Sequence, residues 1–361
     1  MNLFTRKLSC ASLALAFAFS CSSAALAQAP TPDSAHHKWA LMLHGGAGVI
    51  ASMSPEAEAN YRAGLKEALI AAANVLDKGG SSLDAVETAI KLLEDNPLFN
   101  AGRGAVFAAD GTNQLDAAIM DGETMRAGAV ADVQRTRHPI SLARAVMEQS
   151  PHVMLIGSGA DDFAAHVNLE QVPPSFFFTE RRWQELLRQL KKDGSPIPPR
   201  PEGVPAPPAK PVAAFESGDT HKYGTVGVVA LDRRGNIAAG TSTGGTTAKR
   251  WNRVGDSPII GAGTYASNQS CAVSATGTGE YFIRLTAART ICALVQYKGE
   301  SLQDAVDQVV QKDLAAIHGD GGVVALTPDG QLAWSFNTPR MFRAKLKEGG
   351  TPQISINREE P

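Results

Sequence analysis

The stretch TVGVVAL at residues 225–231 changes the character of the chain and decides the fold. It is a continuous apolar run rich in β-branched residues, which is typical of a fully buried strand. The segment RRGN at 233–236 supplies a turn, and a second apolar run leads into TSTGG at 241–245. The pattern predicts two strands joined by this turn, with a threonine at the start of the first and threonines at the end of the second.

A proline-rich segment lies ahead of this hairpin. Residues 194–212 read GSPIPPRPEGVPAPPAKPV, with eight prolines. Proline lacks the amide hydrogen that helices and central strands require, so the segment is expected to be an extended, exposed linker.

Strands and helices are expected on both sides of the linker. Before it we expect strands at 39–43, 105–107, 115–120, 127–133 and 152–156, with helices at 56–78, 81–95, from Pro139 onward and at 180–192. Ser81 and Asp84 form a capping-box pattern. After it we expect strands at 259–263 and 271–276, helices at 281–296 and 302–317, and a closing hairpin of 323–326 with 332–335. This order predicts an α/β layered fold with helices outside packed sheets, in one composite domain.

The first 27 residues have the pattern of a secretory signal peptide. Arg6 and Lys7 precede an apolar run at 8–19, and Ala25-Leu26-Ala27 is a small-residue cleavage site. The run is shorter than the roughly 20 residues that span a membrane. The residues before Cys21 match a lipoprotein signal poorly. We therefore expect secretion, with a bacterial periplasm as the destination and no membrane attachment of the mature chain.

The composition argues against a nucleic-acid partner, because the net charge is −2 and no basic block is present. Two cysteines, Cys271 and Cys292, remain after the signal. Both lie in apolar surroundings, so buried free thiols are expected ahead of a disulfide, without excluding one. The eight histidines show no ligand spacing for a transition metal.

Four segments rich in threonine and glycine lie at or beside strand ends in the second half. Strand ends are where a scaffold presents site residues, although threonine in strands and glycine in turns are also ordinary. Together with HGGAG at 44–48, NPLFNAGRGAVF at 96–107 and LDAAIMDG at 115–122, the segments GTVGVVALD, TSTGGTT, RVGDSPIIGAGTYA and SATGTGEYFIR resemble the plant-type asparaginase and isoaspartyl peptidase family. The resemblance spans residues 40–165 and 220–345. It implies an αββα sandwich of the N-terminal-nucleophile hydrolase type.

The resemblance also implies that the chain cuts itself between Gly224 and Thr225. The products would be an α chain, 28–224, and a β chain, 225–361. A threonine hydroxyl is a weak nucleophile that needs a base. The new α-amine of Thr225, with a pKa of about 7.7–8.0 in model peptides, would be that base. Gly224 adds no side chain, so the backbone there can take the turn that cleavage requires.

Further roles follow from the resemblance. Thr243 would hydrogen-bond the nucleophile, with Thr241 and Ser242 as rivals on spacing alone. Thr276 and the Gly277 amide would form the oxyanion hole. Arg253 would grip the α-carboxylate of the substrate, and Asp256 its α-ammonium; as a sequence pattern, the two also read as a surface ion pair. Gly279, Asn100 and Gly46 would border the substrate.

A structural sodium ion is implied as well, with no cofactor for catalysis. Its ligands would be backbone carbonyls in the loop 93–103, namely those of Leu93, Glu94, Asn96, Phe99, Ala101 and Arg103. Carbonyl cages suit hard cations. The family also implies a dimer of cleaved two-chain units.

The sequence thus predicts an autoprocessed threonine hydrolase that converts β-aspartyl dipeptides and L-asparagine to L-aspartate. The alternative in the same class is a glycosylasparaginase-type amidase, but that relative typically has Asp where this chain has Gly224. Gly46-x-Gly48-x-x-Ala51 also matches a dinucleotide loop, yet no strand ending in an acidic residue follows about 20 positions later. A binding protein without catalysis is a third reading. Neither the preference between the two substrates nor the assembly can be predicted from the residues.

Overall fold

The computed structural model describes residues 38–48, 53–207 and 224–360, all of which lie in one compact unit. The signal peptide, Ala51 of the dinucleotide-like pattern and residues 208–223 of the region before the predicted cut fall outside the described residues. In the described residues, no helix is long and apolar enough to cross a bilayer.

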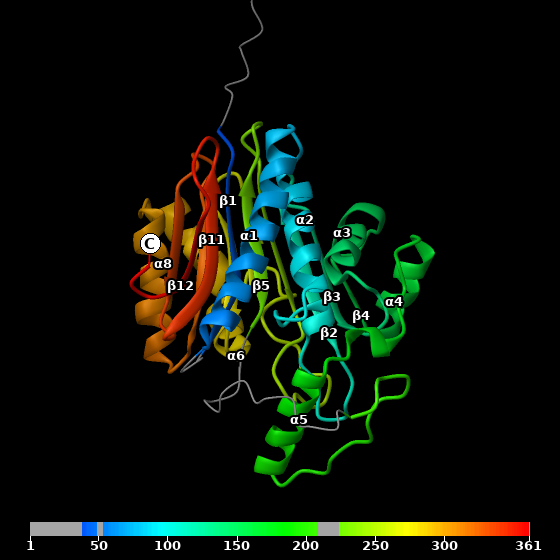
Figure 1. The fold of residues 1–361 in the computed structure, drawn as a ribbon. Coiled ribbons are helices and arrows are strands. Elements are labelled where there is room, and N and C mark those ends of the chain that lie inside the picture. Colours follow the sequence, from blue (N-terminus) through cyan, green and yellow to red (C-terminus); the bar gives the residue numbers. More distant parts are fainter. Residues whose placement is uncertain (1–37, 49–52, 208–223, 361) are drawn as a thin grey trace, which may run out of the picture. The chain divides into compact units, whose positions relative to one another are not determined.

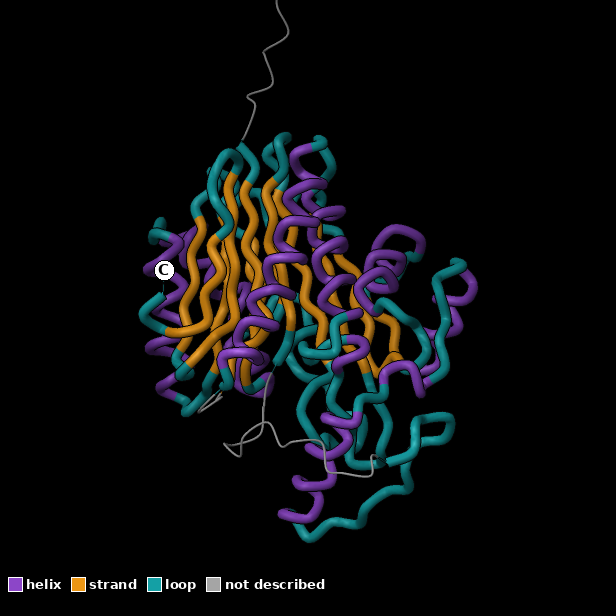
Figure 2. Tube along the Cα trace, in the orientation of Figure 1, coloured by secondary structure: helices purple, strands orange, loops and turns teal. Residues whose placement is uncertain are grey.

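Two antiparallel-rich sheets lie face to face between two layers of helices (Figures 1 and 2). The first sheet has eight strands in the order β12-β11-β1-β5-β6-β2-β3-β4, and the second has four in the order β10-β9-β8-β7. The αββα sandwich expected from the resemblance is confirmed. The strands of the first sheet are β1 Ala40–Gly48, β2 Leu115–Asp121, β3 Ala127–Val133, β4 Met154–Ile156, β5 Val226–Leu231, β6 Ile237–Thr243, β11 Arg340–Lys347 and β12 Gln353–Asn357; those of the second are β7 Thr264–Ala266, β8 Ala272–Gly277, β9 Gly321–Leu326 and β10 Leu332–Phe336.

Helices of the first half cover the outer face of the large sheet, and those of the second half cover the small sheet (Figure 1). The first set is α1 Pro55–Asp77, α2 Ser82–Asp95, α3 Pro139–Gln149 and α4 Gly157–His166, whereas α5 Glu180–Lys192 lies apart from the sheet and packs against Phe107 (Figure 1). The second is α6 Gly279–Leu285, α7 Ala287–Ala293 and α8 Leu302–Asp307, with π-helical turns at Leu294–Lys298 and Gln308–Leu314. The predicted capping box is present, because Ser81 and Asp84 each accept a backbone amide of the other.

The central strands carry the site between two buried cores. Strand β5 pairs with β1 on one side and with β6 on the other, and all six of its residues are buried. One core fills the space between the sheet and α1, α2 and α3, and the other fills the space between the sheets. The start of β5 and the end of β6 are therefore held from both faces, which suits a rigid catalytic hairpin.

Several predicted elements are wrong in position or extent. Residues 105–107 form a loop, because the amide of Val106 donates to the Asn100 side chain and the carbonyl of Phe107 accepts from Ala248. Residues 259–263 are also a loop, whose carbonyls at Gly261 and Ala262 accept amides from the first turn of α7. That docking accompanies a break in the helix expected at 281–296, where Thr286 takes a left-handed conformation (φ 45°).

The predicted hairpin at 323–335 does not close the fold. Two further strands, β11 and β12, follow it and form the edge of the large sheet beside β1. Strand β11 carries four basic residues in eight, so it lacks the apolar pattern of a buried strand. Its Arg343 is nonetheless 1% exposed, because its guanidinium lies over the rings of Trp334 and Phe336.

The two cysteines form a disulfide, so the expectation of free thiols is wrong. Cys271 directly precedes β8, and Cys292 lies in α7, with their Cα atoms 5.3 Å apart. The strand and the helix pack against each other, which brings together residues that are 21 positions apart in sequence. The bond ties α7 to the strand that ends at Thr276 and Gly277.

The described part of the proline-rich segment, residues 194–207, forms no helix or strand, as predicted, but it is anchored to the body of the molecule. Arg200 forms an ion pair with Glu180 of α5, and Ser195 accepts a hydrogen bond of 2.6 Å from Arg250. Helix α5 itself has the predicted bounds and buries Trp183, Leu186 and Leu190 against Phe107.

Candidate active site

Thr225 lies at the start of β5 and its side chain points to the end of β6. Its hydroxyl donates to the Thr243 hydroxyl at 3.1 Å, and Thr225 is 7% exposed. The β5–β6 register explains the contact, because Val226 lies opposite Ser242 and the next pair outward is Thr225 beside Thr243. The chain is continuous through Gly224, so this geometry belongs to the uncut precursor.

The two rivals of Thr243 have other partners. Thr241 lies two residues before Thr243 in β6, and its hydroxyl is 2.7 Å from the Ser274 hydroxyl in the space between the sheets. Ser242 points to the opposite face of the sheet, as alternation requires, and donates to the buried Glu94 carboxylate at 2.7 Å. Only Thr243 of the three contacts Thr225.

Strand β8 of the second sheet ends at the predicted oxyanion residues. Gly277 lines one pocket together with Thr225, Thr243, Arg253 and Asp256. The Thr276 hydroxyl accepts the amide of Ala47 at 3.1 Å, which links the oxyanion strand to the HGGAG segment. The structure thus places Gly277 in the pocket of the nucleophile. In the uncut chain the Thr276 hydroxyl is hydrogen-bonded to the amide of Ala47.

The Arg253 guanidinium makes a two-pronged ion pair, and its partner was not predicted. Its Nε and Nη2 each donate to a Glu280 carboxylate oxygen at 2.8 Å. Glu280 is in the first turn of α6, directly after Gly279. The surface ion pair between Arg253 and Asp256 that the sequence pattern also allowed is absent from the described residues. In the sequence, the only indication that Glu280 belongs to the site is its position at the end of the segment TGTGE, residues 276–280.

Asp256 is left without a counter-ion in direct contact. It is 4% exposed, and its Oδ2 has no hydrogen-bond partner among the described residues. Burial raises the pKa of this carboxyl to about 7, against the opposing effects of its backbone hydrogen bond and the Arg253 charge. A buried carboxylate with an unused oxygen is suited to a cationic ligand.

Gly279 lies between Arg253 and Asp256, the two residues predicted to bind the charged groups of the substrate. A Cβ atom there would lie 2.8 Å from Asp256 Oδ1 and 2.9 Å from Arg253 Nη2. Any side chain would therefore displace one of the two charged groups. Glycine at this position keeps both groups at the same pocket.

Asn100 and Gly46 lie beside Gly224, the residue on the N-terminal side of the bond that would be cut. The Asn100 side chain donates to Gly245 O at 2.8 Å and accepts from Val106 N at 2.9 Å, so it ties its loop to the segment after Thr243. Gly46 has φ +114°, and a Cβ on it would be 2.7 Å from Gly224 Cα. Only glycine allows this approach to the backbone at Gly224.

The sequence reasoning gave no role to His44, which contacts the nucleophile through its backbone. Its Nδ1 donates to Thr225 O at 3.1 Å, and its Nε2 accepts from the Ser274 hydroxyl at 3.0 Å. Burial lowers the pKa of His44 to about 3, so the ring is neutral and the carbonyl of Thr225 fixes its tautomer. Its place at the head of HGGAG was the available signal.

The loop 93–103 is built around close approaches of glycine to backbone carbonyls. A Cβ on Gly102 (φ +48°) would lie 2.4 Å from Glu94 O, and one on Gly104 would lie 1.9 Å from Phe99 O. Two of the carbonyls that the resemblance gives to a cation thus face positions where no side chain fits. The remaining four, of Leu93, Asn96, Ala101 and Arg103, belong to the same loop. No cluster of His, Cys, Asp and Glu suited to a metal is found in the described residues.

Comparison with known proteins agrees with this geometry. A family model described as asparaginase matches residues 37–356. The chain is 47% identical to an isoaspartyl peptidase of Salmonella typhimurium and 48% identical to one of Escherichia coli, with alignments that cover 90% of this chain and 100% and 97% of theirs. It is 40% identical to a plant-type L-asparaginase of Pyrococcus abyssi over 86% of this chain and 97% of that protein. The chain belongs to the asparaginase family of N-terminal-nucleophile hydrolases.

Proposed function

We propose that the chain cleaves itself before Thr225 and then hydrolyses the side-chain amide of L-asparagine and of β-aspartyl dipeptides, releasing L-aspartate. The observation that carries this proposal is one pocket that joins Thr225 and Thr243 to Arg253 and to Asp256. The pocket combines a nucleophile, Thr225, with Arg253 for a carboxylate and Asp256 for an ammonium group. This combination suits an aspartyl substrate that is attacked at its side-chain carbonyl.

Each step uses groups of this chain. In the precursor, the Thr225 hydroxyl attacks the Gly224 carbonyl carbon, the peptide bond breaks, and water hydrolyses the resulting ester to leave a free α-amine on Thr225. In the mature enzyme that amine takes the hydroxyl proton while Oγ1 attacks the substrate side-chain carbonyl. Thr276 and the Gly277 amide stabilise the oxyanion. The protonated amine then gives its proton to the departing amine, and water hydrolyses the aspartyl ester.

Purified cleaved enzyme should release L-aspartate from both L-asparagine and β-Asp-Leu. An enzyme-coupled aspartate assay with each substrate tests this directly. Tight binding of either compound without release of aspartate would instead support a binding protein.

The rate should depend on pH through two groups that must both lose a proton. Asp256, with a pKa near 7, must be charged to hold the α-ammonium, and the Thr225 amine must be neutral to act as base. We expect kcat/KM for L-asparagine to fall once the pH drops below about 8, and a plot of log kcat/KM against pH should reach a limiting slope of about two below about pH 7.

The Asp256→Asn variant separates the two groups, because its pocket side chain cannot titrate. Its residual kcat/KM should fall with a slope of about one, from the amine alone. A slope of two in the variant would remove Asp256 from the pH dependence, and a pH-independent wild type would remove both groups.

We also propose that the mature chain starts at Gln28 and is exported to the periplasm. The signal pattern supports this, and so does the disulfide, because disulfides persist in oxidising compartments and are rare in the cytosol. Osmotic-shock fractionation of the native host, with N-terminal sequencing, tests it. Full-length chain confined to the cytosol would contradict it.

The loop 93–103 is proposed to hold a sodium ion through its backbone carbonyls. The close approach of Gly102 to Glu94 O and of Gly104 to Phe99 O, which keeps the loop tightly folded around its carbonyls, supports this. The ion would neutralise converging carbonyl dipoles and so stiffen the loop that carries Asn100. Replacing sodium chloride by choline chloride at equal ionic strength should lower the melting temperature; an unchanged value would contradict the proposal. The family resemblance further supports a dimer of two-chain units, which sedimentation can test.

A further inference from the structure

A second pocket lies on the far side of the bond before Thr225. It is lined by Gly46, Asn100, Gly224 and Arg182, with Tyr61, Leu98, Phe99 and Phe342 among its apolar walls. The first pocket is lined by Thr225, Arg253 and Asp256, whereas this one is lined by Gly224. The bond between Gly224 and Thr225 thus separates the two pockets.

The chemistry of the nucleophile gives the second pocket a use. The Thr225 amine donates the proton that the departing amine needs, so the departing amine must lie beside Thr225 N. Gly46 lies there, since a Cβ on it would be 3.5 Å from Thr225 N. Because Gly46 also lines the second pocket, a residue attached to the departing amine would extend into it once cleavage has freed Gly224.

The pocket contains one buried cation. Arg182 of α5 is 2% exposed; its Nε donates to Gly104 O and its Nη1 to Glu185, both at 2.8 Å. Its third nitrogen, Nη2, has no hydrogen-bond partner among the described residues. Buried arginines generally use all of their donors, so a free Nη2 at a pocket wall is suited to an anionic ligand.

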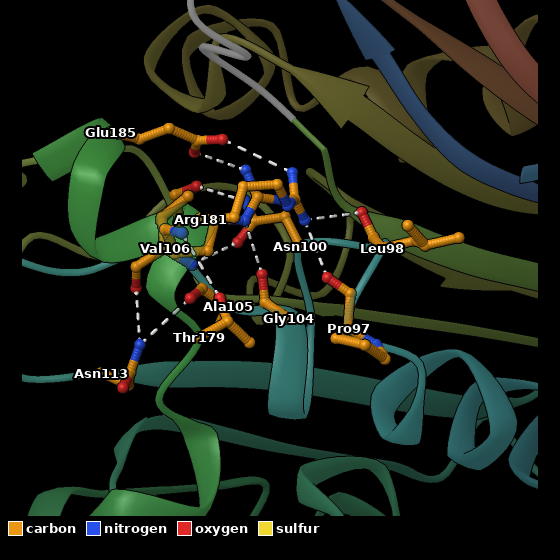
Figure 3. A network of polar contacts seen from close by, with 12 residues as sticks. Pro97, Leu98, Asn100, Gly104, Ala105, Val106, Asn113, Thr179, Arg181 and Glu185 are labelled. Carbon is orange, nitrogen blue, oxygen red and sulfur yellow. Dashed lines mark hydrogen bonds and ion pairs between the residues drawn. The ribbon is translucent and has the colours of Figure 1, made fainter. Parts of the chain in front are cut away.

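The charge around this wall is positive. The neighbouring Arg181 donates to the carbonyls of Pro97 and Leu98, and its pKa is lowered by burial and then by the charge of Arg182 (Figure 3). Glu185 supplies one negative charge against these two positive charges. A carboxylate is a suitable ligand for an arginine at this wall, and the leaving residue of a β-aspartyl dipeptide carries one.

We propose that Arg182 binds the α-carboxylate of the residue that leaves from a β-aspartyl dipeptide, in a subsite lined by Gly46 and Asn100. This inference rests on the proposed function and adds to it a preference for dipeptides with a free C-terminus. L-Asparagine releases ammonia and does not use the subsite.

The test compares three substrates on the cleaved two-chain enzyme: β-Asp-Leu, its C-terminal amide and L-asparagine. We expect wild-type kcat/KM to be at least about tenfold higher for the free acid than for the amide, since only the acid can pair with the guanidinium. Arg182→Met should bring that ratio close to one, while kcat/KM for L-asparagine changes by less than about threefold.

Arg200 provides a matched control, because it is another arginine that forms an ion pair in contact with α5. Arg200 pairs with Glu180 of α5 but does not line the pocket, so Arg200→Met should keep the wild-type ratio. The acid-to-amide ratio of the wild type needs no variant, so it decides the matter even if Arg182→Met fails to mature.

Equal rates on acid and amide in the wild type would overturn the inference. So would an equal loss on all three substrates in Arg182→Met, which would mean that Arg182 supports the loop at Asn100 or holds the new carboxylate of Gly224. The proposed function fails separately, if wild-type enzyme releases aspartate from neither β-Asp-Leu nor L-asparagine.

Discussion

Replacing Thr225 by alanine should leave the chain in one piece and without activity. The substitution removes the hydroxyl that attacks the Gly224 carbonyl, and without the cut no α-amine forms to act as base. Wild-type protein should give two chains of 197 and 137 residues, residues 28–224 and 225–361, whereas Thr225→Ala should give a single chain of 334. Intact mass spectrometry reads both outcomes, and kcat should fall by more than about 10⁴-fold.

Thr225→Ser is the matched control for this variant. It keeps a hydroxyl within reach of Thr243 and should still cleave, although more slowly, because serine lacks the methyl group that restricts χ1. A wild-type chain that stays intact by mass and yet hydrolyses asparagine would refute the N-terminal-nucleophile mechanism. A Thr225→Ala chain that is cut at the same bond would refute self-cleavage by this hydroxyl.

The catalytic hairpin could be predicted because its evidence is local. An apolar β-run, a four-residue turn and a second run place the start of β5 beside the end of β6 by strand geometry alone. The same holds for the cap of α2 at Ser81 and for the amphipathic helix α5, whose bounds were both predicted. In each case the residues that decide the structure are within a few positions of one another.

The parts that could not be predicted depend on partners far along the chain. Strand β11 is basic and pairs with β1, some 300 positions away, while its Arg343 is covered by aromatic rings of β10. The disulfide needed the packing of α7 on β8, and nothing in the spacing of two cysteines fixes that. The partner of Arg253 likewise depends on α6 starting at the mouth of the pocket.

The ion pair between Arg253 and Glu280 affects how a substrate can bind. In the structure both prongs of Arg253 are occupied by Glu280, whose side chain is 56% exposed. A substrate carboxylate must take the place of the Glu280 carboxylate, which solvent can then hydrate at little cost. The buried Asp256 has no such substitute and stays unpaired until an ammonium arrives.

Arg253→Ala should therefore mature normally but lose at least about 100-fold in kcat/KM for β-Asp-Leu, or 2.7 kcal/mol. Self-cleavage does not use the substrate carboxylate, and the exposed Glu280 left behind is solvated, so neither folding nor the cut depends on this guanidinium. Arg250→Ala removes the same charge from the same loop, at an exposed position outside the pocket, and should stay within about threefold of wild type.

The same contact predicts which peptide linkage is cleaved. In α-Asp-Leu the carboxylate that Arg253 would bind is consumed in the peptide bond, so the guanidinium would face an amide and lose its ionic partner. Leaving a desolvated charge without a partner costs several kcal/mol. Wild-type enzyme should cleave β-Asp-Leu and leave α-Asp-Leu intact, as measured by leucine release. Comparable rates on the two linkages, or an Arg253→Ala enzyme of near wild-type efficiency, would remove Arg253 from substrate recognition, and Glu280 would then be its structural partner alone.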